Sequence, residues 1–417
     1  MSEISILIIS NGHGEDLMGG FLAKTLRELH PPALIRAFPV VGVGKYYSHL
    51  NIPIVGIQRK VPSEGLTMRS VKVFWRDIMH GLISLSLRQF SSLLQLQNTV
   101  DLAIVIGDSY ALFMACRYVR KPIIFIPTAK SDYIGGHSSV EIKQMKRHCA
   151  FVYPRDSSTA DKLCKAGVPA QYMGNLMMDS LDITEKDFGL PGGKVIGILP
   201  GSRDESYVNI VHLAAAALCL QEKLSSVRFL VAIAPNLSMK RFIQSMRKEG
   251  WRFTPSHPQE IERGITAEFQ KRNCVLYFVE GRFGDVLSQS KVCLGMAGTA
   301  NEQAVGLGKP VISFAGDGPG FNDVFLQKQK NLLGEALITV KKSPDEMATA
   351  AEKILLDSSL YSKLAAAGQE RMGGRGAAQR IAESILQLAK DMRLLHEGRE
   401  FSSRSFKENS FKTNSDS

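Results

Sequence analysis

Short runs of apolar residues alternate with longer amphipathic segments along most of the chain. The runs at 4–10, 101–110 and 121–126 are rich in β-branched residues. They are nearly continuous in their apolar character, which is typical of strands buried in a parallel sheet. Parallel strands need crossover connections, and these are usually helices. The pattern therefore predicts an α/β protein with doubly wound parallel sheets.

The alternation is interrupted at residues 179–193, where the chain is polar, contains Gly and Pro, and lacks core periodicity. It restarts with the apolar run 195–199. We therefore predict two Rossmann-like domains, residues 1–180 and 181–395, joined by this linker. Ligands bind at the carboxyl edge of open α/β sheets, so we expect a cleft between the two edges.

Three further segments carry separate expectations. The last helix, at about 377–395, is expected to cross back onto the first domain or to pack on a partner, as in a homodimer. Residues 396–417 are aperiodic and rich in Ser, Lys and Asn, which predicts disorder. A basic amphipathic helix is predicted at about 69–97. It packs on a sheet or lies on a membrane, and the sequence leaves both open.

A turn with anion-binding character follows the first strand of the second domain. The strand ends at Pro200, and Gly201, Ser202 and Arg203 precede a predicted helix at 204–220. Such a turn points backbone N–H groups outward in front of a helix N-terminus, and an Arg guanidinium binds phosphate through two donors. We predict diphosphate binding here. The alternative is an ordinary turn with a surface arginine.

A second turn of the same kind lies in the same domain. Gly298 and Thr299 open a helix directly after a strand, and Glu302 and Gln303 follow in its first turns, within reach of ribose hydroxyls. Two helix N-termini that converge from one domain suit a nucleoside diphosphate. The pair is therefore more specific than either turn alone.

Candidate proton acceptors follow strands of the first domain. The glycine-rich loop at 11–20 lacks G-x-G-x-x-G spacing, so no nicotinamide or flavin cofactor is expected. His13 and Asp16 are expected to face the cleft, where either would accept a substrate proton, although Asp16 would also stabilise a helix N-terminus. Asp108 ends a buried strand at the same edge, and is either a site residue or a helix N-cap.

Composition narrows the class of partner. The net charge of +11 over 417 residues suits a nucleotide-bearing substrate or an anionic membrane surface. The chain has no helix-turn-helix, zinc-finger or aromatic RNA-binding motif, so no nucleic acid is expected. Its six cysteines are scattered without metal-ligand spacing, which predicts a reducing cytoplasm and no metal site. No secretory signal and no membrane-spanning run are expected.

Taken together, several of these segments resemble the lipid-A-disaccharide synthase family of glycosyltransferases. The resembling segments, in the family's order, are the first loop with Asp16, Asp108 in VIGD, AGVPAQYMGNLMMD (166–179), LPGSR (199–203), AGTANEQA (297–304) and NLLG (331–334). The resemblance implies a GT-B fold and inverting, metal-independent transfer of an acylated glucosamine from UDP to a lipid acceptor. It also implies a cytoplasmic enzyme, peripheral at the inner membrane face and without a cofactor.

The resemblance also implies roles for individual residues. Asp108 matches the family's proposed general base, Arg203 lies at the UDP diphosphate, and Asn331 lies near the donor. Gly12 and Gln303 depart from the family, which carries glutamates at both positions, and IPTAKSDYIGG (126–136) replaces a tryptophan-rich segment. These departures lie mainly on the acceptor side, so the donor is better supported. The alternatives are a UDP-N-acetylglucosamine 2-epimerase-like isomerase and a non-catalytic nucleotide- or lipid-binding protein.

Overall fold

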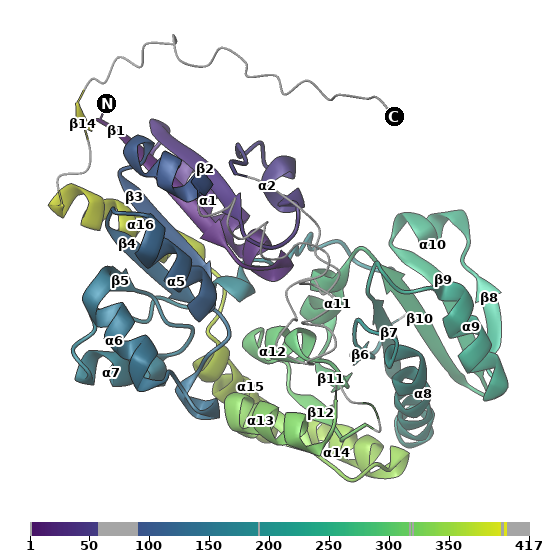
Figure 1. The fold of residues 1–417 in the computed structure, drawn as a ribbon. Coiled ribbons are helices and arrows are strands. Elements are labelled where there is room, and N and C mark those ends of the chain that lie inside the picture. The colour runs from purple at the N-terminus through teal and green to yellow at the C-terminus, as the bar shows by residue number, and fades with distance from the viewer. Residues whose placement is uncertain are drawn as a thin grey trace, which may run out of the picture.

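The computed structural model describes residues 2–56, 91–190, 192–316, 318, 321–392 and 396–397. Most of the predicted basic helix, residues 69–90, lies outside the described residues, as does the tail from residue 398. Within the described ranges, the chain forms two α/β domains, each built on its own sheet (Figure 1).

The first domain contains a parallel sheet with the order β2-β1-β3-β4-β5. Its elements are β1 (Ser2–Ser10), α1 (His13–Leu29), β2 (Ala33–Pro39), α2 (Lys45–His49), η2 (Gln97–Thr99), β3 (Leu102–Gly107), α5 (Ser109–Tyr118), β4 (Ile123–Pro127), η3 (Asp132–Ile134), α6 (Ser139–His148), β5 (Cys149–Val152), α7 (Ser157–Lys165) and η4 (Leu176–Met178).

Helices cover both faces of this sheet, which explains the nearly continuous apolar run of β1. Ile6 and Ile8 pack with residues of α1 on one face. Leu7 and Ile9 point to the other face and pack with residues of α5. Successive strand residues point to opposite faces, so a strand buried on both sides must be apolar at nearly every position.

The second domain has an eight-stranded sheet with the order β13-β12-β11-β6-β7-β10-β9-β8. Its elements are β6 (Lys194–Leu199), α8 (Ser206–Lys223), β7 (Val227–Ile233), α9 (Met239–Lys248), β8 (Arg252–Pro255), α10 (Pro258–Glu262), β9 (Ile265–Lys271), β10 (Cys274–Glu280), α11 (Phe283–Gln289), β11 (Val292–Gly295), α12 (Thr299–Gly306), β12 (Val311–Ser313), α13 (Asp323–Leu333), η5 (Gly334–Ala336), β13 (Leu337–Thr339), α14 (Pro344–Leu356) and α15 (Ser358–Met372).

Six of these strands, from β13 to β10, are parallel and follow the Rossmann order. The other two, β8 and β9, are antiparallel and were not predicted. In β9, buried Ile265, Ala267 and Phe269 alternate with half-buried residues. A strand with one solvated face has this alternating pattern, and the prediction relied on continuous apolar runs.

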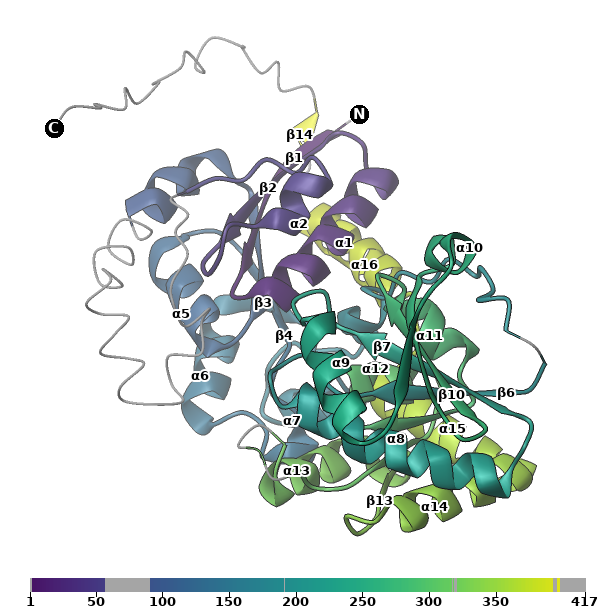
Figure 2. The same ribbon diagram turned by 90° about the vertical axis from the view of Figure 1, so that its right-hand side faces the viewer.

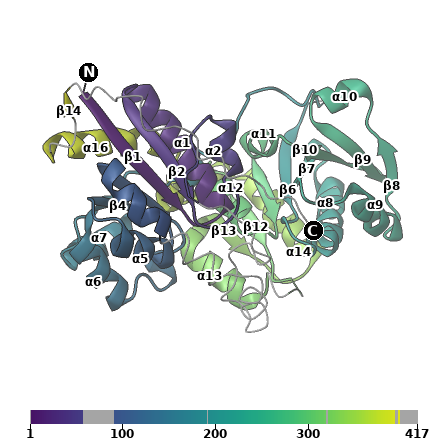
Figure 3. The same cartoon turned by 45° about the horizontal axis from the view of Figure 1, so that its top comes forward.

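The chain crosses between the domains twice. The segment predicted as a polar linker packs on the second domain, where Leu181 and Phe188 are buried in the core. After α15, helix α16 (Ala377–Asp391) returns to the first domain (Figure 3) and lies beside α1 (Figure 2). After α16, His396 and Glu397 form β14, which pairs antiparallel with the start of β1.

The described helices include none that is long and apolar enough to cross a membrane.

Candidate functional site

The two predicted anion-binding turns lie side by side in the second domain. Strands β6 and β11 are neighbours, with Leu199 paired to Gly295 at their carboxyl ends. The sheet order reverses between these two strands, and this switch point is where ligands bind in Rossmann-like sheets. The turns that lead into α8 and α12 therefore leave the sheet at its expected binding position.

Both turns are held by a buried asparagine of α8. The Asn209 amide donates to the carbonyls of Pro200 (3.0 Å) and Met296 (3.5 Å), one in each turn. The Met296 N–H also donates to the Leu199 carbonyl at 2.9 Å. With their carbonyls engaged toward the protein, the turns can present N–H groups outward, as an anion site requires.

The first turn depends on a glycine and carries polar groups that lack a partner. Gly201 has φ +103°, and a Cβ there would lie 3.2 Å from the Met296 carbonyl oxygen, so glycine is needed on both counts. The Ser206 hydroxyl is buried beside it and has no hydrogen-bond partner among the described residues. Ser202 and Arg203 are exposed, and within the described ranges no side chain pairs with the Arg203 guanidinium.

The second turn is held from α13. The Gln329 amide donates to the carbonyls of Ala297 and Gly298, both at 3.1 Å, and its oxygen accepts from Asn301 at 3.0 Å. Gln329 and Asn301 are buried. Thr299 is exposed at the first position of α12, next to Gly298. The predicted diphosphate residues of both turns are thus brought together.

Two predicted ribose-binding residues are engaged by protein groups. The Glu302 carboxylate accepts a 2.5 Å hydrogen bond from Arg155 of the first domain. The buried Gln303 amide donates to the Met177 carbonyl (3.1 Å) and the Ser180 hydroxyl (3.2 Å). Gln303 therefore faces the segment between the domains, which corrects its expected place at an open ribose site.

Asn331 also lies away from the turns. Its amide oxygen accepts from Gln327, one helical turn earlier, at 3.0 Å on an exposed face of α13. Gln329 is two positions before Asn331, and residues two apart point to different sides of a helix. The side chain of α13 that reaches the second turn is therefore Gln329, and the expected place of Asn331 near the donor stays a prediction.

Asp108 lies at the carboxyl edge of the first sheet and also caps α5. Its Oδ1 accepts from the backbone N–H groups of Tyr110 (3.0 Å) and Ala111 (3.2 Å), and from the Asn11 amide at 2.7 Å. The side chain is exposed. The N-cap alternative is therefore confirmed, and a role for Asp108 as a site residue stays a prediction.

Glu15 is a carboxyl group of this edge that the sequence analysis did not select. From the first turn of α1, its Oε1 accepts a 3.0 Å hydrogen bond from the Thr128 hydroxyl, which follows β4. Burial raises the pKa of Glu15, the hydrogen bond from Thr128 lowers it, and the charge of Asp108 raises it. The net shift is upward, so Glu15 is a stronger base than an ordinary carboxylate.

The two proton acceptors predicted on α1 differ in position. His13 is exposed at the start of the helix, beside Gly42. Asp16 is fully buried and accepts a 2.6 Å hydrogen bond from the Ser10 hydroxyl, which corrects its expected place facing a cleft. Asp16 shares its helix face with the buried Gly19 and Gly20, so the phase of α1 turns it into the domain.

The carboxyl edges of the two sheets face each other. Arg155, which is buried, donates both to the Thr128 carbonyl (3.0 Å) and to Glu302 (2.5 Å), so it joins the end of β4 to the first turn of α12. Nearby, the Arg371 guanidinium stacks 3.7 Å above the Tyr133 ring of η3. The anion-binding turns and the Asp108 edge therefore belong to facing sides of the two domains.

Among the residues that sequence reasoning missed, Asn209 and Ser206 left a detectable signal, because each is a polar residue on the apolar face of the predicted helix. Gln329 lies in a polar run, and Arg155 follows a strand as many surface arginines do. No local pattern distinguishes either of them.

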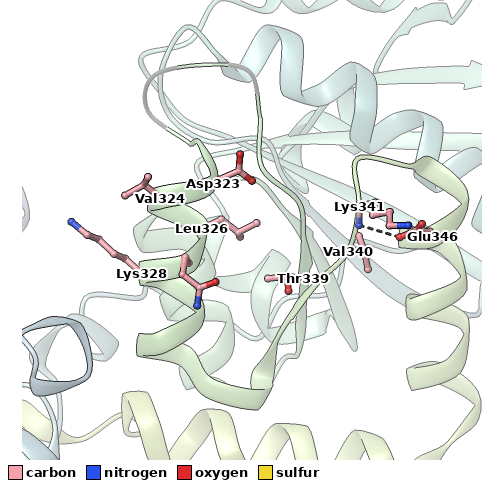
Figure 4. A pocket seen from close by; sticks show the side chains of 9 residues that line it. Asp323, Val324, Leu326, Lys328, Thr339, Val340, Lys341 and Glu346 are labelled. Atoms are coloured by element: carbon pink, nitrogen blue, oxygen red, sulfur yellow. Dashed lines mark hydrogen bonds between the residues drawn. The ribbon is translucent and has the colours of Figure 1, made fainter.

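An open groove elsewhere in the second domain is a poor anion site (Figure 4). It lies between α13 and the chain after β13, where the Lys341 N–H donates to Glu346 at 3.0 Å. Its lining residues are Asp323, Val324, Leu326, Gln327, Lys328, Thr339, Val340, Lys341 and Glu346. Acidic and basic groups balance there. The described residues also contain no group of three or more His, Cys, Asp or Glu side chains able to hold a metal ion.

No model of a known protein family matches the chain. Lipid-A-disaccharide synthases of two Coxiella burnetii strains, Dugway 5J108-111 and RSA 331 / Henzerling II, are 25% identical to it over 253 residues. The match covers 58% of this chain and 63% of theirs, so it spans less than two thirds of these relatives.

Solved structures match over nearly the whole chain. A UDP-N-acetylglucosamine 2-epimerase from Neisseria meningitidis, solved with UDP-N-acetylglucosamine bound, is 16% identical with a TM-score of 0.60 over 92% of this chain and 100% of its own. The Methanocaldococcus jannaschii UDP-N-acetylglucosamine 2-epimerase is 14% identical with a TM-score of 0.54 over 92% and 99%. These matches confirm the predicted fold class: the chain has two Rossmann-like domains in the GT-B arrangement, with a weak sequence relationship to lipid-A-disaccharide synthases.

Proposed function

We propose that this protein is a UDP-sugar-dependent glycosyltransferase. The observation that carries the proposal is the pair of turns at Gly201 and Gly298, side by side at the switch point of the second sheet. Each turn precedes a helix N-terminus, and the exposed Arg203 and buried Ser206 hydroxyl beside the first turn are unpaired within the described ranges. A diphosphate would pair with the Arg203 guanidinium and with the N–H groups of both turns together.

The chemistry we propose is inverting and needs neither metal nor cofactor. A hydroxyl of a lipid acceptor at the inner membrane face attacks the anomeric carbon of a glucosamine-type sugar. Arg203 and the two helix N-termini stabilise the UDP leaving group. Asp108, by the family resemblance, and the exposed His13 are candidates to remove the proton. The weak similarity to lipid-A-disaccharide synthases supports this donor and acceptor class.

UDP binding tests the diphosphate site. UDP should raise the melting temperature (Tm) of the protein, because a ligand bound only to the folded state stabilises it. Arg203→Ala should bind UDP roughly 10- to 100-fold more weakly, since it loses charge-assisted hydrogen bonds. The control is Arg147→Ala, which changes an exposed arginine of α6. Full UDP affinity in Arg203→Ala would overturn the phosphate assignment.

The fold of the epimerase neighbours supports a second candidate function, isomerisation of a UDP-sugar without an acceptor. Incubation with UDP-N-acetylglucosamine alone separates the two functions. A 2-epimer formed without acceptor would favour the isomerase, and UDP release that depends on an added lipid acceptor would favour transfer. If neither incubation gives a product while UDP still binds, the protein is a non-catalytic binding protein.

A further inference from the structure

We propose that Glu15 accepts the proton of the attacking hydroxyl, and that Asp108 is a positioning residue beside it. The inference rests on the proposed function. In this step the acceptor oxygen bonds to the anomeric carbon as the bond from that carbon to the diphosphate breaks. The hydroxyl proton moves to the Glu15 carboxylate, and the bonding electron pair leaves with UDP.

The position of Glu15 supports this role. Strand β3 lies between β1 and β4 in the sheet, yet Glu15, which follows β1, accepts from Thr128, which follows β4. Its side chain therefore extends across the end of β3. A Cβ at Gly107, the last residue of β3, would lie 3.7 Å from the Glu15 Cγ. The carboxyl group is thus held over the centre of the edge, beside Asp108.

The local backbone leaves room for Glu15 and for little else. A Cβ at residue 12 would lie 2.6 Å from Glu15 Oε2, well inside van der Waals contact. Only glycine at position 12 is compatible with this placement of the carboxyl group. Within the described ranges, the hydrogen bonds to the Glu15 carboxyl group come from the Thr128 hydroxyl, at Oε1, and from the backbone N–H of Glu15 itself. The carboxylate therefore keeps lone pairs that can accept a substrate hydroxyl.

Asp108 is already engaged at the oxygen that faces its neighbours. Three donors converge on its Oδ1: the Asn11 amide and the N–H groups of Tyr110 and Ala111. A carboxylate oxygen has about two lone-pair sites, so this oxygen has none left for a substrate hydroxyl. Protonating Asp108 would also weaken the cap of α5. Its charge, however, makes the neighbouring Glu15 more basic.

The groups around Glu15 determine the direction in which its pKa shifts. Burial raises the pKa of Glu15 most, Asp108 adds to the rise, and the Thr128 hydrogen bond and the His13 charge lower it. Asp16 and Tyr47 face it from within the domain, and Arg155 is held at the Thr128 carbonyl. A base whose pKa lies closer to the working pH transfers protons more effectively.

Turnover and UDP binding, measured on the same variants, test the proposal. Glu15→Gln should lower turnover of a UDP-sugar by roughly 10²- to 10⁴-fold, the range for loss of a general base, while the UDP-induced Tm shift stays unchanged. Glu15→Asp should recover part of the rate. The control is Glu28→Gln, an exposed glutamate of the same helix. A Glu15→Gln rate within tenfold of the native rate would overturn the proposal.

Thr128→Val tests the proton-accepting role of Glu15 through the pH dependence of the rate, which would not change if Glu15 were only structural. Losing the hydroxyl removes a hydrogen bond that lowers the pKa of Glu15, so the acidic limb of the pH–rate profile should shift to higher pH. Carboxyl ¹³C NMR adds a measurement independent of turnover. The Glu15 signal, assigned by its loss in Glu15→Gln, should give a pKa above the usual range for a glutamate. This pKa should be lower in Asp108→Asn, which lacks the neighbouring charge. An ordinary titration of this signal overturns the inference alone. Absence of both UDP binding and turnover overturns the proposed function itself.

Discussion

Asp16 is a charged residue in the interior of the first domain. It is fully buried and accepts a 2.6 Å hydrogen bond from Ser10, which in turn accepts one from the buried Tyr47 at 2.9 Å. The second carboxyl oxygen, Oδ2, is buried without a partner in the described structure. Burial raises the pKa of Asp16 to about 6, because the charged form loses its hydration.

Stability should therefore depend on pH through Asp16. Between pH about 4 and about 6 the folded state holds a proton that the unfolded chain releases, so the free energy of unfolding falls as pH rises. A rise from 3.8 to about 6 corresponds to about 3 kcal/mol at neutral pH. Asp16→Asn should remove this dependence. The difference between the Tm of the variant and the Tm of the native protein should therefore become more positive from pH 4 to pH 7.

The comparison needs an exposed aspartate as a control, and Asp161 on α7 provides one. Asp161→Asn should give a Tm difference from the native protein that changes little over the same pH range. A Tm difference for Asp16→Asn that stays constant with pH would contradict the burial argument.

At the scale of single residues, the sequence predicted positions better than orientations. Arg203 and Asp108 are exposed at carboxyl edges because a strand end determines where the next residues lie. Asp16 and Gln303 were misplaced because their directions depend on helix phase and on neighbouring elements. An error of one residue in helix phase turns a side chain by about 100°.

Helix α13 stabilises a turn that belongs to another element. Gln329→Leu would leave the carbonyls of Ala297 and Gly298 without their donor, so the N-terminus of α12 should lose its fixed position. We expect UDP affinity to fall about tenfold, which corresponds to about 1.4 kcal/mol, as for one or two hydrogen bonds. Calorimetric titration with UDP would measure this change.

Gln327→Leu is the matched control, because Gln327 lies on the same helix but donates to the exposed Asn331. Its UDP affinity should remain near the native value. Equal losses in both variants would mean that α13 acts through its general stability and not through the Gln329 hydrogen bonds.

At the scale of elements, the strand–helix alternation predicted both sheets because each strand carries its own apolar pattern. The contacts that hold the turns were not predictable in the same way. Asn209 and Gln329 reach the turns from helices whose packing is set by the whole domain. The antiparallel β8 and β9 were missed because short, half-exposed strands resemble polar loops in sequence.

The whole molecule depends on a charged contact between its domains. Arg155 and Glu302 are 8% and 16% exposed at their side chains, so removing either leaves the other poorly hydrated. Arg155→Met or Glu302→Gln should lower the free energy of unfolding by up to about 3 kcal/mol. This is the smallest loss typical of removing one partner from a buried ion pair. The double variant should lose less than the sum of the two single variants, as a double-mutant cycle of thermal unfolding would measure.

The exposed pair between Lys363 and Glu335, whose side chains are 68% and 60% exposed, is the control, and Lys363→Ala should change Tm little. Additive losses in the Arg155 and Glu302 cycle would show that the two side chains are not coupled. The sequence did not predict this contact, because its partners lie 147 positions apart and belong to different domains.

The return of α16 has a consequence for synthesis of the chain. Its buried residues, among them Ala377, Ile381 and Ile385, share one core with β1 and α1. A ribosome makes β1 first and α16 only after the entire second domain, and domains generally fold as they emerge. The first domain therefore keeps one flank of its core uncovered until α16 has been made, and its native core is completed only after the second domain has been synthesised.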